Sequence, residues 1–143
     1  MKIAQISVFL ENRPGRLSAL TRRLADAGVN LSTLMLSDNG EFGLLRLLTP
    51  DVAQALQTIQ AAGYASTTTE VVALEVPDQP GGLANVLSVI EKAGRSVEYM
   101  YAFAERPGKA AIMVFRFDDM DQALGALQTA GIGIRTPVDL FAS

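Results

Sequence analysis

The chain repeats itself, and this internal repeat limits the folds open to it more than any other feature. The motif Pro14-Gly15-Arg16-Leu17 returns 66 residues later as Pro80-Gly81-Gly82-Leu83. Farther along the offset is 68, because Gln54-Ala55-Leu56 returns as Gln122-Ala123-Leu124. The two extra residues belong in the loop at 105–109, since turn-rich loops tolerate insertions. We therefore expect two small units of one fold.

The first half begins with a strand, a helix and a β-hairpin. Residues 3–10 alternate apolar and polar side chains, as a half-buried strand does. Apolar residues at helical spacing follow from Leu17 to Ala27, and Gly28 ends that helix. Two further strands, at 30–37 and 42–48, are joined by the turn Asp38-Asn39-Gly40.

A second helix and a last strand complete each half. Thr49-Pro50 is typical of a helix start, with Thr49 as the cap and Pro50 in the first helical position. Residues 65–71 are rich in Thr and Val and predict the fourth strand. The order βαββαβ, with right-handed crossovers, places both helices on one face of an antiparallel sheet. We predict an α+β chain of two ferredoxin-like units, at 1–70 and 71–143.

The composition excludes several classes of function. The chain contains neither cysteine nor histidine, so it cannot hold a thiolate nucleophile, a Ser-His-Asp triad or a Cys/His zinc site. We expect no enzyme activity, no cofactor and no metal. The net charge is −3 and no Lys/Arg cluster is present, which argues against nucleic acid. No apolar stretch is long enough to span a membrane and the N-terminus lacks signal-peptide character, so we expect a cytoplasmic protein without a membrane partner.

The most specific local feature is the loop between the first strand and the first helix, which occurs twice. Each copy places a polar turn and a Pro-Gly pair at a helix start, where unpaired N–H groups and the helix dipole attract a carboxylate. Gly15 and Gly81 allow a ligand close to the backbone, and Asn12 and Asp78 offer an oxygen to an ammonium group. These two chemistries together suit an α-amino acid. From these residues alone, ordinary turn and capping chemistry is the better explanation, and duplication would copy such turns as well.

These loops, the βαββαβ order and the stretch Ala27-Gly28-Val29-Asn30-Leu31 resemble the ACT domain, twice, over nearly the whole chain. The resemblance is greatest to free-standing tandem ACT proteins. It implies allosteric binding of small molecules, most often amino acids, where the first loop of one unit meets the second strand of a neighbouring unit. The ligand-binding residues that it implies in the first half are Asn12, Arg13, Pro14, Gly15, Arg16 and Leu17, with Asn30 and Leu31. Those in the second half are Asp78, Gln79, Pro80, Gly81, Gly82 and Leu83, with Ser96 and Val97.

Two other groups of residues suggest functions. Tyr99, Tyr101 and Phe103 alternate along one strand, opposite Met100 and Ala102, and we expect them on the open face of the sheet, with Phe115 and Phe117 joining them. Such a face favours a contact with another subunit over stacking on RNA bases, because accompanying basic residues are sparse. Three acids, Asp118, Asp119 and Asp121, lie at a helix start, where capping is a better explanation than a metal site.

We conclude that the sequence predicts a non-enzymatic amino-acid sensor, with a homodimer and a regulated enzyme as further candidate partners. Occupied sites at the seam between units would couple ligand binding to the arrangement of the units. One alternative is a ligand-free module that docks on an enzyme or regulator. A second alternative is a small enzyme that uses carboxylates, Lys and Tyr, but no converging set of such residues is evident.

Overall fold

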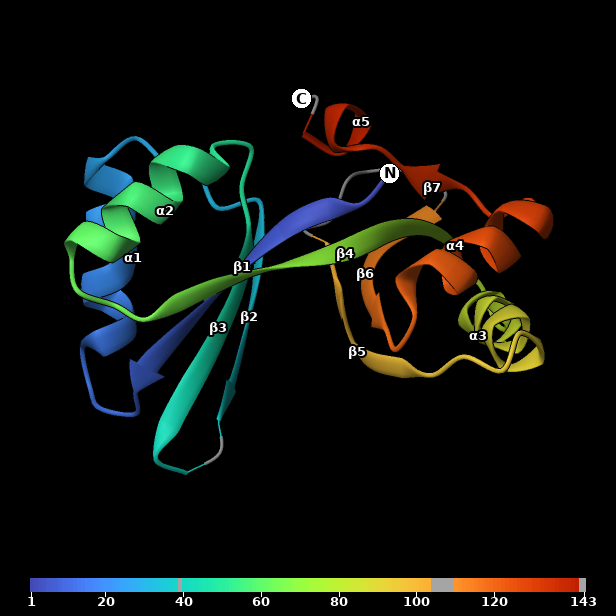
Figure 1. The fold of residues 1–143 in the computed structure, drawn as a ribbon, viewed down its shortest axis with the longest axis horizontal. Helices are drawn as coiled ribbons and strands as arrows, with labels where there is room; N and C mark the ends of the chain where they lie inside the picture. The colour runs from blue at the N-terminus through green and yellow to red at the C-terminus, as the bar shows by residue number, and fades with distance from the viewer. Residues whose placement is uncertain (39, 104–109, 142–143) are drawn as a thin grey trace. The chain divides into compact units, whose positions relative to one another are not determined.

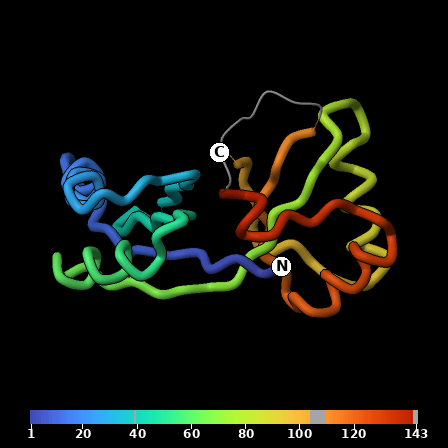
Figure 2. Tube along the Cα trace, turned by 90° about the horizontal axis from the view of Figure 1, so that it is seen from above, coloured from blue at the N-terminus to red at the C-terminus, as the bar shows by residue number. Residues whose placement is uncertain are grey.

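The computed structural model describes residues 1–38, 40–103 and 110–141, and it divides into two compact units (Figure 1). The first unit comprises Ala4–Thr69, and the second comprises Met1–Ile3 together with Glu70–Ser143. In each unit two long helices cover one face of an antiparallel sheet, and the path of the chain can be followed from a second direction in Figure 2. This arrangement confirms the predicted pair of ferredoxin-like units.

The first unit follows the predicted order of strands and helices. Its elements are β1 (Ile3–Glu11), α1 (Arg16–Asp26), β2 (Thr33–Asp38), β3 (Phe42–Leu48), α2 (Val52–Ala61) and the first residues of β4 (Ser66–Pro77). Its strands lie in the order β2-β3-β1-β4. Alternation along β1 buries Val8 and Leu10 on the helix-facing side, where they pack with Leu20 and Leu24 of α1. Gly28, at φ 77°, ends the first helix as expected, because glycine adopts this left-handed conformation without a steric penalty.

The second unit uses the rest of β4 as its first strand. It continues with α3 (Gly82–Lys92), β5 (Val97–Ala102), β6 (Ala110–Phe117), α4 (Met120–Thr129), β7 (Ile134–Arg135) and α5 (Pro137–Phe141). Strand β4 pairs with β6 on one side and with β7 on the other. The repeat did not predict α5, and the fourth strand of this unit is reduced to the two residues of β7. Leu140 of α5 is buried, so this short helix is part of the fold.

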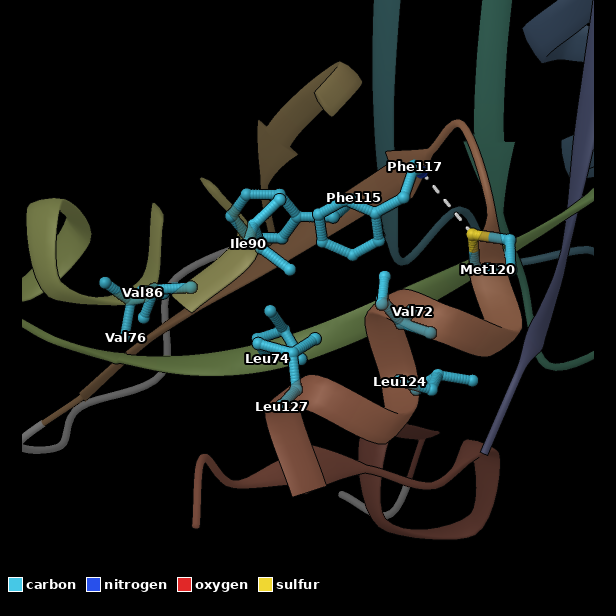
Figure 3. Packing of buried hydrophobic residues seen from close by; sticks show 11 residues of the cluster. Val72, Leu74, Val76, Val86, Ile90, Phe115, Phe117, Met120, Leu124 and Leu127 are labelled. Atoms are coloured by element: carbon cyan, nitrogen blue, oxygen red, sulfur yellow. Dashed lines mark hydrogen bonds between the residues drawn. The ribbon is translucent and has the colours of Figure 1, made fainter. Parts of the chain in front are cut away.

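The core of the second unit lies between its sheet and helices α3 and α4 (Figure 3). Phe115 and Phe117 are fully buried there and stack with their ring centroids 5.4 Å apart. The expectation that they join the open face is therefore wrong. The β5–β6 register places Phe115 opposite Met100, and residues directly opposite each other in a sheet share a face.

The three alternating aromatic residues along and just after β5, Tyr99, Tyr101 and Phe103, are only partly as predicted. Tyr101 pairs with Val114, which places it on the face away from Met100, but Tyr101 and Phe103 are only 8% and 9% exposed. Leu140 of α5 and Ile112 of β6 line one small cavity on this face. The prediction of an open aromatic face is thus incorrect for these positions.

Several predicted boundaries also shift. Strand β2 begins at Thr33 rather than at residue 30, and α2 begins at Val52 rather than at Pro50. The Thr49 hydroxyl does accept a backbone N–H, but it is that of Asp51, before the helix begins. Asn39 and the loop at 105–109, where we expected a turn and an insertion, lie outside the described residues.

Candidate functional site

The first loop, between β1 and α1, is exposed and held by a local network of polar contacts. The Asn12 backbone N–H donates to the carbonyl of Glu41, and its side-chain Nδ2 donates to Asp38 Oδ2 over 3.0 Å. Arg13 and Arg16 both form ion pairs with Glu11, at 3.1 and 3.7 Å. These arginines therefore have an acidic partner at the end of the preceding strand.

The second loop, between β4 and α3, borders a cavity of about 490 Å³. Asp78, Gln79 and Pro80 contribute the loop side of this cavity. Leu83 of α3 and Ala111 and Met113 of β6 contribute apolar walls. Four of the predicted site residues thus surround one cavity, and the strand residues opposite them were not predicted because nothing local marks their orientation.

Both helices that follow these loops begin with a glycine cap. Gly15 and Gly81 adopt nearly the same left-handed conformation, with φ 85° in each case. A glycine cap has no side chain, so nothing on the cap residue itself competes for the N–H groups of the first helical turn. The first of these groups in each helix already donates within the loop, Arg16 to the carbonyl of Arg13 and Gly82 to that of Gln79. The N–H groups of the next two residues, together with the partial positive charge of the helix, are suited to a carboxylate.

Neither polar residue ahead of the glycine caps its helix. Asn12 is bonded to Asp38, which leaves its Oδ1 atom to accept from a ligand. The Asp78 side chain is exposed and makes no hydrogen bond or ion pair with any other described residue. Capping therefore does not explain these two residues, whereas turn chemistry explains Asn12, whose side chain joins its loop to Asp38. Asp78 remains a carboxylate beside a cavity and a helix N-terminus.

The remaining predicted residues lie elsewhere. Within each unit, the start of the second strand is at the opposite end of the sheet from the loop, since Val97 pairs with Phe117 whereas Pro77 pairs with Ala110. Asn30 is exposed, Leu31 packs against the first core and Val97 against the second. No single unit brings Asn30-Leu31 or Ser96-Val97 to its own loop. The two apolar loop residues, Leu17 and Leu83, also pack against their respective cores.

The three acids at the start of α4 stabilise local structure. Asp119 caps this helix by accepting from the backbone N–H of Gln122, which confirms the capping prediction. Asp118 accepts from the N–H of Ser96 and pairs with Arg95, and the Ser96 hydrogen bond holds the pKa of Asp118 below its usual value. Asp121 pairs with Lys2, whose pKa is raised by this hydrogen bond. In the part of the chain that the structure describes, no cluster of three acidic residues is placed to hold a metal ion.

Among the described residues, no helix has both the length and the apolar character needed to cross a membrane.

Comparison with known proteins places this chain in a family. Residues 1–132 match the family model described as an ACT domain pair. The fold is also that of protein BT0572 from Bacteroides thetaiotaomicron, with a TM-score of 0.93 and 35% identity over 100% of this chain and 98% of that one. Comparison with curated proteins finds no match.

More distant structures share the fold alone. The regulatory subunit of aspartate kinase from Thermus flavus has a TM-score of 0.62 at 17% identity, over 90% of this chain and 92% of that one. The ligand-free form of the regulatory subunit from Thermus thermophilus has a TM-score of 0.64 at 15% identity, over 90% of each chain. The structural likeness thus extends to proteins described as regulatory subunits.

Proposed function

Because the chain belongs to the ACT domain pair family, we propose that it is a non-enzymatic regulatory protein that binds a free amino acid at its strand-to-helix loops. The observation that carries this proposal is the second loop. There a cavity, a helix N-terminus with a glycine cap and an Asp78 side chain that no other described residue engages occur together. These three features match the three parts of an amino acid.

The proposed binding mode follows from the chemistry of each part. The ligand carboxylate accepts hydrogen bonds from the N–H groups of the first turn of α3, as anions do at helix N-termini. The ligand ammonium group donates to the Asp78 carboxylate in a charge-assisted hydrogen bond. The ligand side chain enters the cavity beside Leu83, Ala111 and Met113, so an apolar amino acid is favoured.

The first loop offers a related but different site. Asn12 supplies a neutral amide oxygen where Asp78 supplies a carboxylate, so an ammonium group is attracted more weakly there. Arg13 and Arg16 add positive charge that Glu11 partly neutralises. We infer that the two loops differ in affinity and that the second is occupied first. The placement of both sites at a seam between units, with Asn30-Leu31 and Ser96-Val97 on the other side, stays a prediction.

The partners of the proposed sensor also remain predictions. Homodimer formation and a cytoplasmic location are expected for a small regulatory protein of this kind, and a regulated enzyme is the candidate target. Ligand binding would act on such a target only through a difference in ligand affinity between two states of the protein. Light scattering on the purified protein measures the oligomeric state with and without ligand.

Calorimetric titration with apolar amino acids tests the proposal, using Asp78→Ala as the site variant and Asp26→Ala as a matched control. Asp26 is also an exposed aspartate, but it lies at the last residue of α1. We expect Asp78→Ala to weaken binding about tenfold or more, because a charge-assisted hydrogen bond is lost. Asp26→Ala should bind like the unaltered protein. Equal affinity in the two variants would refute the site, and absence of binding to any amino acid would favour the ligand-free docking module.

A further inference from the structure

Four arginines are concentrated in the first loop and the first helix of the first unit. All four are exposed, and we call them the arginine surface: Arg13, Arg16, Arg22 and Arg23. Residues 11–26 contain these four arginines but only two acids, Glu11 and Asp26. Helix α2, which packs beside α1 in the helical layer of the unit (Figure 1), contains no charged residue. This stretch is therefore basic in a chain whose net charge is −3.

The acids of the first unit do not neutralise the arginine surface. Arg13 and Arg16 share a single carboxylate, that of Glu11. The side chains of Arg22 and Arg23 make no ion pair or hydrogen bond with any other described residue. In the second unit, by contrast, every described arginine has an acidic partner: Arg95, Arg116 and Arg135. The first unit thus presents guanidinium groups that lack carboxylates.

The internal repeat shows that the fold does not require these arginines. At the four matching positions, 66 residues later, the second unit has uncharged residues: Gln79, Gly82, Ser88 and Val89. There Gly82, Val89 and Ile132 are among the residues that line a cavity of about 370 Å³ beside α3. The loop and helix are nevertheless built alike, with a glycine cap at φ 85° in each unit. The arginines therefore have a reason other than the fold.

The position of Arg16 is unfavourable for the isolated helix. Arg16 begins α1, where the partial positive charge of the helix N-terminus favours acids, and the first turn contains no acid. Arg16 and Arg23 lie on the same side of the helix, because seven residues are nearly two turns, and they are about 10 Å apart along its axis. Carboxylates at this spacing on a partner would pair with both guanidinium groups and offset the unfavourable charge.

The residue types of this surface indicate the class of partner. A guanidinium group binds a carboxylate through two parallel hydrogen bonds, and arginine is enriched at protein interfaces whereas lysine is depleted. The exposed positions of α1 include no large apolar side chain that could enter a lipid bilayer. The net charge of −3 opposes the approach of a phosphate polymer. An acidic protein segment fits these observations best.

We propose that the arginine surface is a docking site for an acidic segment of another protein, whose carboxylates recur at about the spacing of two helical turns. Charge complementarity carries this inference, since Arg22 and Arg23 have no acidic partner among the described residues. The inference does not depend on the proposed binding of an amino acid. It assigns to the first unit the contact through which a regulatory protein reaches its target.

Fluorescence anisotropy with a labelled acidic peptide tests this inference on the full chain, without added amino acid. The probe is a peptide of about 15 residues, made of alanine and glutamate, with a glutamate at every third or fourth position. Its control has glutamine in place of each glutamate. We expect the glutamate peptide to bind with an affinity that decreases as the salt concentration rises, and the glutamine peptide not to bind. Absence of salt-dependent binding overturns the proposal.

Three variants locate the bound peptide on the protein. The double variant Arg22→Glu and Arg23→Glu should weaken binding about tenfold or more, because two attractions become repulsions. Arg23→Gln should weaken it less. Lys92→Gln is the matched control and should bind like the unaltered protein, because Lys92 is the exposed basic residue in the last turn of α3, as Arg23 is in α1. Equal binding by the double variant, or an equal loss in Lys92→Gln, overturns the proposal.

Two competing probes distinguish a protein partner from the other polyanions. They are vesicles that contain phosphatidylserine and single-stranded polyuridylate. All substituted positions are exposed, and each variant is first checked for a cooperative thermal transition. We expect both probes to bind more weakly than the glutamate peptide. Tighter binding to either probe, if it is lost in the Arg22→Glu and Arg23→Glu variant, overturns the proposal in favour of a membrane or a nucleic acid.

Discussion

Among the described glycines of the second unit, Gly82 is the one at which an added Cβ atom would make the shortest contact, because α3 begins close to the preceding loop. A Cβ atom placed there would lie 2.0 Å from the Pro77 carbonyl oxygen, about 1 Å inside the shortest contact that such atoms adopt. That oxygen also accepts the N–H of Gln79 over 2.9 Å, so a shift of the carbonyl strains the turn. The cost of overpacking of this kind is about 1–3 kcal/mol.

The Gly82→Ala substitution brings a smaller opposing gain. Alanine loses less backbone entropy than glycine in a helix, which is worth at most about 1 kcal/mol. We therefore expect Gly82→Ala to lower the free energy of unfolding by about 1–2 kcal/mol. Gly125→Ala is the matched control, because Gly125 is inside α4 and, beyond its chain neighbours and the backbone of its own helix, no described atom lies within 4 Å of the position of its Cβ. This control should be stabilised by about 0.5–1 kcal/mol.

Urea denaturation measures both variants under the same conditions. The urea midpoint should be lower than that of the unaltered protein for Gly82→Ala and higher for Gly125→Ala. The two variants should differ by about 2 kcal/mol in the free energy of unfolding, and the slope of this free energy against urea concentration should be the same. If Gly82→Ala is as stable as Gly125→Ala, the α3 helix does not approach Pro77 as described. The explanation of why a glycine stands where the first unit has Arg16 would then fail with it.

Three other substitutions test the core and the acids around α4. Phe115→Ala should lower the free energy of unfolding, measured by urea denaturation, by about 3–5 kcal/mol because the ring is fully buried. Val138→Ala, at an 81% exposed position, should change this free energy little. Asp119→Ala should lower the free energy of unfolding by about 1 kcal/mol because it removes a helix cap. Asp51→Ala is the control and should be nearly neutral, because Asp51 makes no side-chain cap bond. Equal losses in the two variants would contradict the capping role of Asp119. The backbone N–H of Ser96 holds the pKa of Asp118 below the 3.8 that is usual for an aspartate, so its contribution is present above pH 3.8 and decreases as the pH falls through the folded pKa. Asp118→Asn should flatten the loss of stability in that acid range, and an unchanged pH profile would show that Asp118 is not responsible.

Local patterns in the sequence were sufficient to predict the fold. Alternation identified β1, and the spacing of Leu17, Leu20 and Leu24 identified α1, because burial on one face imposes a period on each element. The helix ends followed from Gly28 and its repeat Gly94, both at positive φ. The start of α2 was misplaced because Thr49-Pro50 satisfies the same rules as a helix start, although the Thr49 hydroxyl accepts the N–H of Asp51, the residue before the helix.

Features that depend on pairing between strands were not predictable in the same way. The spacing of Phe115 and Phe117 shows that they share one face of their strand. Only the register that pairs Phe115 with Met100 shows which face of the sheet this is. The loop at 105–109 separates the two strands, so the register could not be counted from the sequence. The cavities were missed for the same reason, since Met113 and Ile132 come close to α3 only through tertiary packing. In contrast, the position of Asp78 ahead of a helix N-terminus was predictable, because its loop occurs twice and carries its own turn residues.

Thermal unfolding of the full chain against a panel of the twenty amino acids shows whether the folded protein binds a free amino acid. A ligand that binds only the folded state stabilises it by about 2.7 kcal/mol at a concentration one hundred times its dissociation constant. We predict that one apolar amino acid, or a small group of them, raises the melting temperature with increasing concentration, and that Asp78→Ala reduces this rise. No concentration-dependent rise with any amino acid at millimolar concentration would contradict the proposed binding.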